Sequence, residues 1–156
     1  MTPAVLQARR AGIDFSLHEY PAGDGNGPWG LEAARRLGLE PEQVLKTLVL
    51  RLSDQRLVLA LLPVHRPLDL KLLARAAGAR KAALADAEDA RRATGYVPGG
   101  ISPLGPKQRL PCFIERSAAS LDQVFVSGGR RGLEIGLSPE DLRRLTAAQW
   151  ADLLRL

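Results

Sequence analysis

A stretch dense in glycine and proline, about two thirds of the way along the chain, most constrains the fold. Residues 95–105 hold four glycines and two prolines in eleven positions, so neither a helix nor a strand can run through them. Proline fixes φ and removes a donor, whereas glycine lets another molecule approach the bare backbone. The stretch is either a long turn or a stiff loop whose open amides suit an anion or a developing oxyanion. Its glycine density favours the second interpretation.

Length and charge set the broad class of the protein. The 156 residues fit one domain, residues 1–156, that is large enough to bury a core. No apolar run approaches the ~20 residues of a spanning helix and no signal peptide is recognisable, so we expect a cytoplasmic protein without membrane contact. The formal charge of +5 permits a polyanionic partner such as RNA without requiring one.

The sequence gives little support for a metal site, a disulfide or a reactive thiol. Cys112 is the single cysteine and only His18 and His65 accompany it, which excludes an internal disulfide and a Cys/His zinc cage. Cys112 lies in an apolar run, so we expect a buried thiol. Neither histidine has the spacing of a metal site or a catalytic triad. We therefore expect no metal and no cofactor.

Helices and strands are interspersed along the chain. Capping signals predict helices after Thr2, Asp69, Asp86 and Ser138, the last continuing through Trp150 and Leu154, and a further helix is predicted over residues 31–37. Apolar or alternating runs predict strands over residues 13–17, 44–52, 57–62, 110–115, 123–127 and 133–137. Residues 53–56 join two of these strands as a hairpin. The pattern predicts an α+β fold, with helices around a curved, barrel-like mixed sheet.

Lys46 interrupts an otherwise apolar strand. An ammonium buried there without a partner would be costly, so the side chain either reaches water at an edge or points into a polar cavity. Both sides of this strand are apolar, which favours the cavity. There Lys46 can hold an ester carbonyl or a phosphate.

The glycine-rich stretch matches neither of two familiar motifs, the nucleophile elbow and the P-loop. In a nucleophile elbow the residue after the serine lends its backbone N–H to the oxyanion, but Pro103 follows Ser102 and has none. A P-loop needs lysine after its last glycine, and Pro106 stands there. A serine hydrolase and a phosphate-binding P-loop are both disfavoured.

A second glycine-rich segment, residues 127–132, carries two arginines. It is equally compatible with a hairpin connection and with an anion nest in which Arg130 and Arg131 contact phosphate or RNA. Glu134 follows on a strand, where it either pairs with Arg130 or Lys46 or faces water.

Five segments, in this order and spacing, resemble the YbaK family of aminoacyl-tRNA deacylases, whose close members clear Cys-tRNA(Pro). The segments are residues 44–48, 68–71, 94–96, 99–105 and 126–133. The resemblance runs over nearly the whole chain and implies helices around a curved mixed sheet. It also implies a site with neither a metal nor a nucleophilic side chain.

The resemblance assigns roles to particular residues. It makes Lys46 the essential lysine, and it places the family's glycine loop at residues 99–103, where the Gly99 and Gly100 amides stabilise negative charge. The predicted substrate-binding residues are Tyr20, Trp29, Thr47, Ile101, Ser102, Pro103, Ser127 and Glu134. Glu134 stands where close members carry aspartate, and Trp29 where they carry phenylalanine.

The implied function is removal of a wrong amino acid, with cysteine expected, from mischarged tRNA(Pro). For a cysteinyl ester the substrate's own thiol attacks its carbonyl and forms a thiolactone; another aminoacyl group would need a positioned water. We expect the acceptor end of the tRNA and prolyl-tRNA synthetase as partners. The alternatives are a module that binds the acceptor end or a synthetase without catalysis, and a deacylase for another amino acid such as alanine.

Overall fold

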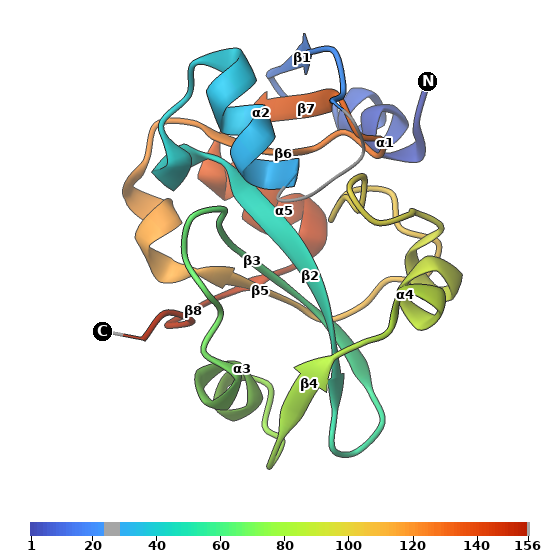
Figure 1. Cartoon of the computed structure of the whole chain (residues 1–156), viewed down its shortest axis with the longest axis vertical. Helices are drawn as coiled ribbons and strands as arrows, with labels where there is room; N and C mark the ends of the chain where they lie inside the picture. Colours follow the sequence, from blue (N-terminus) through green and yellow to red (C-terminus); the bar gives the residue numbers. More distant parts are fainter. Residues whose placement is uncertain (24–28, 156) are drawn as a thin grey trace.

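A hairpin of two long strands forms the centre of the computed structural model of the chain (Figure 1). The structure describes residues 1–23 and 29–155. Strand β2 (Leu45–Leu52) pairs antiparallel with β3 (Leu57–Pro63), as the sequence predicts. Beyond β3, β5 (Cys112–Glu115) and β8 (Gln149–Ala151) add in parallel, and β4 (Ala82–Leu84) pairs antiparallel with the other side of β2. The result is a mixed five-stranded sheet in the order β4-β2-β3-β5-β8.

A smaller sheet lies across one end of the hairpin. Strands β1 (Phe15–Glu19), β7 (Leu133–Leu137) and β6 (Val124–Ser127) pair antiparallel in the order β1-β7-β6. A single bridge between Val44 and Phe125 connects this sheet to the start of β2. The predicted α+β fold with mixed β structure is therefore confirmed, although the strands divide between two sheets.

The core is continuous between the two sheets. Leu61 and Ile114 of the large sheet pack with Val126 and Ile135 of the small one, and all four side chains are fully buried. The other face of the large sheet packs against α3 (Leu70–Ala76), so its strands are apolar on both sides. Burial of one such side chain contributes ~1.5–3 kcal/mol, which explains the long apolar runs in the sequence.

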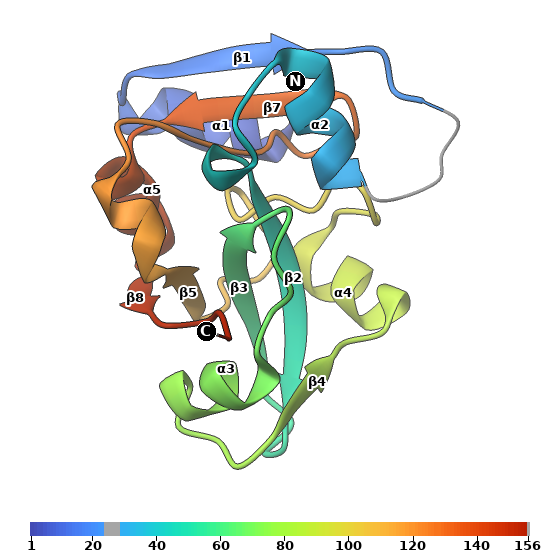
Figure 2. The same ribbon diagram turned by 60° about the vertical axis from the view of Figure 1, so that its left-hand side comes forward.

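The four helix starts predicted from capping residues are confirmed, whereas the helix predicted over residues 31–37 begins two residues earlier, at Trp29. Side chains at the residue before each helix accept backbone N–H groups of the first turn in α1 (Pro3–Ala11), α3, α4 (Ala87–Thr94) and α5 (Pro139–Thr146). These groups have no partner within the helix, so each cap stabilises its first turn. Helix α2 (Trp29–Leu37) lies over the start of β2, and two short 3₁₀ helices, η1 (Pro41–Gln43) and η2 (Arg116–Ser120), complete the elements (Figure 2).

One sequence prediction is wrong at the end of an element, and one strand was missed. The last helix ends at Thr146 instead of continuing through Trp150 and Leu154, because Ala147 adopts a left-handed φ of 53° and the chain then forms β8. Strand β4 was not predicted, since its alanine-rich sequence carries no alternating pattern. Within the described residues, no helix is long and apolar enough to cross a membrane.

Candidate active site

A cavity of 360 Å³ opens where α2, the start of β2, residues 98–101 and the small sheet meet. It brings together eight of the residues singled out in the sequence. These are Tyr20, Trp29, Lys46, Thr47, Gly99, Ile101, Ser127 and Glu134. They come from six separate segments of the chain, so the site exists only in the folded protein. We call this hollow the main cavity.

Lys46 lies near the start of β2, on the cavity side. Its side chain is half-buried, and desolvation lowers the pKa of its ammonium. Within residues 1–23 and 29–155, no carboxylate oxygen lies within 4 Å of the amine. The positive charge is therefore available to an anionic or strongly polarised group of a ligand.

Glu134 lies in β7, opposite His18 of β1 and Ser127 of β6. Only 7% of the residue is exposed, and burial raises the pKa of its carboxyl to about 8. Glu134 is consequently mostly protonated at neutral pH, when it can donate a hydrogen bond as well as accept one. Burial also raises the pKa of Tyr20, with the nearby Glu134 charge as a further cause.

Two polar atoms of the cavity wall have no hydrogen-bond partner among the described residues. They are the indole Nε1 of Trp29 and the hydroxyl Oγ1 of Thr47, and both are buried. Buried polar groups of native proteins are usually paired, because an unpaired one costs free energy. Both atoms are also shielded from solvent, so a ligand in the main cavity reaches them only if the wall shifts.

The glycine-rich loop contributes to the cavity through only part of its length. Gly99 has a left-handed φ of 89°, and a Cβ on it would lie 3.1 Å from the Trp29 ring, so the indole packs directly on its backbone. The Gly100 N–H donates to the Val97 carbonyl at 2.9 Å, and this glycine does not line the cavity. Of the two predicted amides, that of Gly100 is thus already occupied within the loop.

Ser102 and Pro103 lie away from the main cavity. The Ser102 hydroxyl is fully buried and accepts the Leu104 N–H at 3.2 Å, while Pro103 lines a separate cavity of 170 Å³. Cys112 also borders this second cavity; its thiol is buried as predicted, and burial raises its pKa to about 12. Neither Ser102 nor Cys112 is placed to attack a ligand in the main cavity.

Residues 127–133 form the hairpin between β6 and β7. The Gly128 N–H donates to the Leu133 carbonyl and the Gly129 N–H to the Ser127 hydroxyl, so these two amides are satisfied within the turn. Of the two sequence interpretations, the structure thus shows the hairpin.

The two arginines of this turn are bound to carboxylates. Arg130 pairs with Glu19 at 3.0 Å on the surface, and Arg131 pairs with Glu32 of α2 at 3.0 Å. The second pair is mostly buried, with 18% and 12% of the two side chains exposed, and the Arg131 guanidinium lies 6.0 Å from the Trp29 ring centre. Sequence analysis missed Glu32, whose only signal is an acidic residue on the first turn of a predicted helix.

Comparisons with known proteins identify the family of the chain. The model of the family described as "Aminoacyl-tRNA editing domain" matches residues 31–145. A protein of Enterococcus faecalis (strain ATCC 700802 / V583), named as a candidate Cys-tRNA(Pro)/Cys-tRNA(Cys) deacylase, EbsC, is 38% identical over 120 residues. That match covers 77% of this chain and 73% of the relative.

Solved structures show the same fold. A crystal structure of a candidate trans-editing enzyme for prolyl-tRNA synthetase is 27% identical and superimposes with a TM-score of 0.84, over 100% of this chain and 99% of that one. The hypothetical protein APE2540, 23% identical, superimposes with a TM-score of 0.86 over 99% of this chain and 100% of its own. The family match over residues 31–145 and the 38% identical relative lead to one conclusion: the chain belongs to the family of aminoacyl-tRNA editing domains, the YbaK-type deacylases.

Proposed function

We propose that the protein is a trans-editing deacylase that removes cysteine from mischarged tRNA(Pro). The observation that carries the proposal is the half-buried Lys46 amine, which shares the main cavity with Gly99 and has no carboxylate partner among the described residues. The relative of Enterococcus faecalis supports the choice of substrate, since its name specifies Cys-tRNA(Pro) and Cys-tRNA(Cys).

The proposed chemistry uses the cavity to polarise an ester. The ester carbonyl lies between the Lys46 ammonium and the backbone at Gly99, and both stabilise the negative charge that grows on the carbonyl oxygen. The substrate's thiol sulfur attacks the carbonyl carbon, the bond from that carbon to the 3′ oxygen breaks, and the thiol proton passes to the departing 3′ oxygen. The products are a cysteine thiolactone and free tRNA.

This route explains why no side-chain nucleophile is needed. The hydroxyl of Ser127, which lines the cavity, is held by the Gly129 N–H, and Cys112 is buried elsewhere. The protein instead contributes orientation, which lowers the entropic cost of ring closure.

We further propose that Glu134 and Trp29 define the amino-acid end of the cavity. A mostly neutral Glu134 carboxyl offers a donor and an acceptor without the cost of a buried anion. Trp29 packs on Gly99 and lines the main cavity, so its indole forms one wall of the proposed pocket.

The test compares the release of amino acid from Cys-tRNA(Pro), Ala-tRNA(Pro) and Cys-tRNA(Pro) with a methylated thiol. We expect rapid release only for the first, and a loss of ~100-fold or more in the Lys46→Ala protein. Equal rates for all three would rule out thiol assistance. A wild-type protein that binds the tRNA or prolyl-tRNA synthetase but releases nothing would instead be a binding module.

A further inference from the structure

A groove of 570 Å³ is lined by residues of α3, β4 and the chain between them. In Figure 2, α3 and β4 lie at the far end of the large sheet from α2, which borders the main cavity. Four of its seven lining residues are cationic, and none is acidic. The cations are Lys71, Arg75, Arg80 and Lys81, and all four residues are exposed. We call this surface the basic groove.

The charges of the basic groove are not neutralised by the described part of the chain. Within residues 1–23 and 29–155, no carboxylate oxygen lies within 4 Å of any of the four cations. Asp69, next to the groove, accepts the Lys71 and Leu72 amides as the cap of α3 and pairs with Arg155 at 3.5 Å. The nearest acidic group on this side is therefore already bound.

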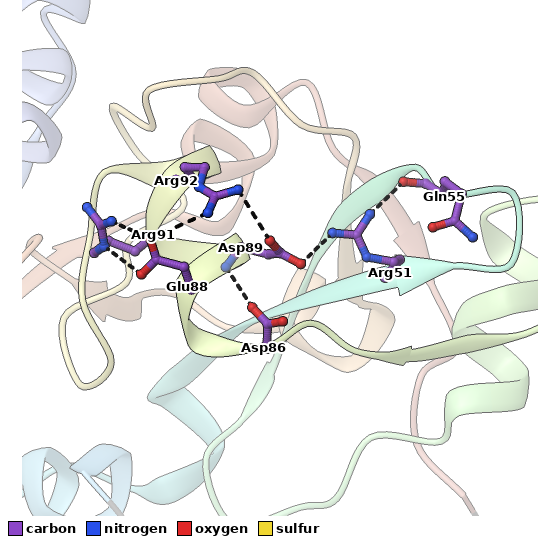
Figure 3. A network of polar contacts seen from close by, with 7 residues as sticks. All are labelled: Arg51, Gln55, Asp86, Glu88, Asp89, Arg91 and Arg92. Atoms are coloured by element: carbon purple, nitrogen blue, oxygen red, sulfur yellow. Dashed lines mark hydrogen bonds and ion pairs between the residues drawn. The ribbon is translucent and has the colours of Figure 1, made fainter.

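The acidic residues on the other side of the groove are also engaged, as Figure 3 shows. Asp89 of α4 pairs with Arg51 at 2.8 Å, and Asp86 accepts the Asp89 N–H at 2.7 Å. Glu88 pairs with Arg91 at 2.5 Å. Such surface pairs are weak. Asp86 and Asp89 line a neighbouring pocket together with Lys81, but no oxygen of either lies within 4 Å of its amine.

We propose that the basic groove binds the sugar–phosphate backbone of the tRNA whose 3′ end occupies the main cavity. The choice of RNA as the polyanion rests on the proposed function, whereas the location rests on the unpaired cations alone. Arg130 and Arg131, which the sequence suggested as RNA contacts, each have a carboxylate partner, so the free positive charge lies elsewhere.

The separation of the two sites suits this partner. Lys46 faces the main cavity, and Leu52, six residues further along β2, is opposite Ala82 of β4 at the edge of the groove. Six residues of strand span ~20 Å. An acceptor arm is longer than this, so one RNA can enter the main cavity with its 3′ end and reach the groove with its backbone.

The chemistry of the groove favours phosphate contacts over reading of bases. Its lining includes Ala79 and Ala82, whose side chains are small, and contains no aromatic residue on which a base can stack. Long cationic side chains bind phosphates whatever the base sequence of the RNA. The groove then supplies affinity, while the identity of the tRNA is selected elsewhere.

The test is a binding titration of uncharged tRNA(Pro) against the wild-type protein and a variant with Lys71→Gln, Arg75→Gln, Arg80→Gln and Lys81→Gln. We expect affinity at ~0.1 M salt to fall at least about tenfold. Each lost phosphate contact reduces the slope of log K against log salt by roughly 0.7–0.9, so the slope should change by about 3.

The matched control removes four other exposed cations that also have no carboxylate within 4 Å among the described residues. It carries Arg9→Gln, Arg10→Gln, Lys107→Gln and Arg109→Gln. We expect this control to keep most of the affinity, because it lowers the net charge equally without touching the groove. Equal losses in both variants would show a general charge effect and overturn the proposal.

A second measurement separates this inference from the proposed function. With a short aminoacylated trinucleotide that cannot reach the groove, the groove variant should deacylate as fast as the wild type; with full-length tRNA its KM should rise while kcat is kept. If nothing is deacylated, the proposed function fails, yet the titration still tests the groove. Unchanged tRNA binding with lost binding of prolyl-tRNA synthetase would assign the groove to a protein partner and overturn our inference.

Discussion

At the scale of single residues, Glu134 shows how burial alters charge. Its folded-state pKa of about 8 lies above the value near 4.3 expected in the unfolded chain. Between these values the folded protein holds a proton that the unfolded protein has released, so the free energy of unfolding falls as the pH rises from ~4.3 to ~8. The stability that protonation of Glu134 contributes is complete below this window and lost above it.

A Glu134→Gln protein tests this directly. Because glutamine does not ionise, the variant should lose part of the decline in unfolding free energy between pH 5 and pH 8, measured by urea denaturation at several pH values. The difference in unfolding free energy between the two proteins should be largest near pH 8, where the wild-type protein is destabilised by a buried anion. Parallel stability curves would show that Glu134 is solvated in the folded protein.

Gly99 is the other residue whose local environment makes a prediction. Its left-handed φ of 89° strains any other residue, and an added Cβ would press on the Trp29 ring at 3.1 Å. Gly99→Ala should therefore shift Trp29 and lower kcat for Cys-tRNA(Pro) by ~10-fold or more, as loss of aligned geometry does. The release assay on the purified variant measures this loss.

Gly38 offers the matched control for backbone strain. It has a φ of 67°, but an added Cβ would meet nothing within 4 Å. Gly38→Ala should lower the free energy of unfolding by ~1 kcal/mol, about as much as the backbone strain in Gly99→Ala does, and leave deacylation intact. If both variants lose activity equally, strain alone explains the effect and the contact between Gly99 and Trp29 is unimportant.

At the scale of elements, the Glu32–Arg131 pair joins α2 to the β6–β7 hairpin. Both side chains are mostly buried, so removing one partner leaves a poorly solvated charge. Glu32→Gln should lower the free energy of unfolding by ~3 kcal/mol. It should also release the guanidinium that lies beside Trp29, and so raise KM for the aminoacyl-tRNA.

The exposed pair of the same hairpin serves as the comparison. Arg130 and Glu19 are 52% and 72% exposed in their side chains, and such pairs contribute little. Glu19→Gln should leave both stability and KM nearly unchanged in denaturation and kinetic measurements. A large effect of Glu19→Gln, or none of Glu32→Gln, would contradict the role assigned to burial.

The elements also show which parts of the fold a sequence reveals. The caps at Thr2, Asp86 and Ser138 were predicted correctly because a cap is a contact between residues three apart. Strand β8 was not predicted, because Ala147 carries no stop signal and the strand exists only through pairing with β5. A helix cap can be recognised from a short stretch of sequence, whereas pairing between strands far apart in the chain is seen only in the structure.

The residues of the candidate site also divide into those that the sequence reveals and those that only the structure reveals. Lys46 was identified because a charge stands out in an apolar strand, and Gly99 because the family resemblance places the glycine loop there. Ser102 and Pro103 follow Gly99 closely in sequence yet lie outside the main cavity, since an irregular loop has no period from which to infer direction. The partner of Arg131, Glu32, is 99 residues away and leaves no local trace.

At the scale of the whole molecule, the two sheets share one core, and this predicts that they unfold together. Three probes report on separate regions: Trp29 over the main cavity, Trp150 in β8 and Cys112 in β5. Cys112 and the partly buried Trp150 pack in the core between the sheets, whereas Trp29 lies on α2 at its edge. A thiol reagent cannot reach the buried Cys112, whose pKa is raised to about 12, until this core opens.

We therefore expect the urea dependence of Cys112 labelling to coincide with the loss of tryptophan fluorescence. Single-tryptophan proteins, Trp29→Phe and Trp150→Phe, separate the two fluorescence signals. Coincident midpoints for all three probes are the signature of cooperative two-state unfolding. If the Trp29 signal changes at lower urea than the other two, α2 and the wall of the main cavity open while the core persists, and the site is a separately unfolding unit.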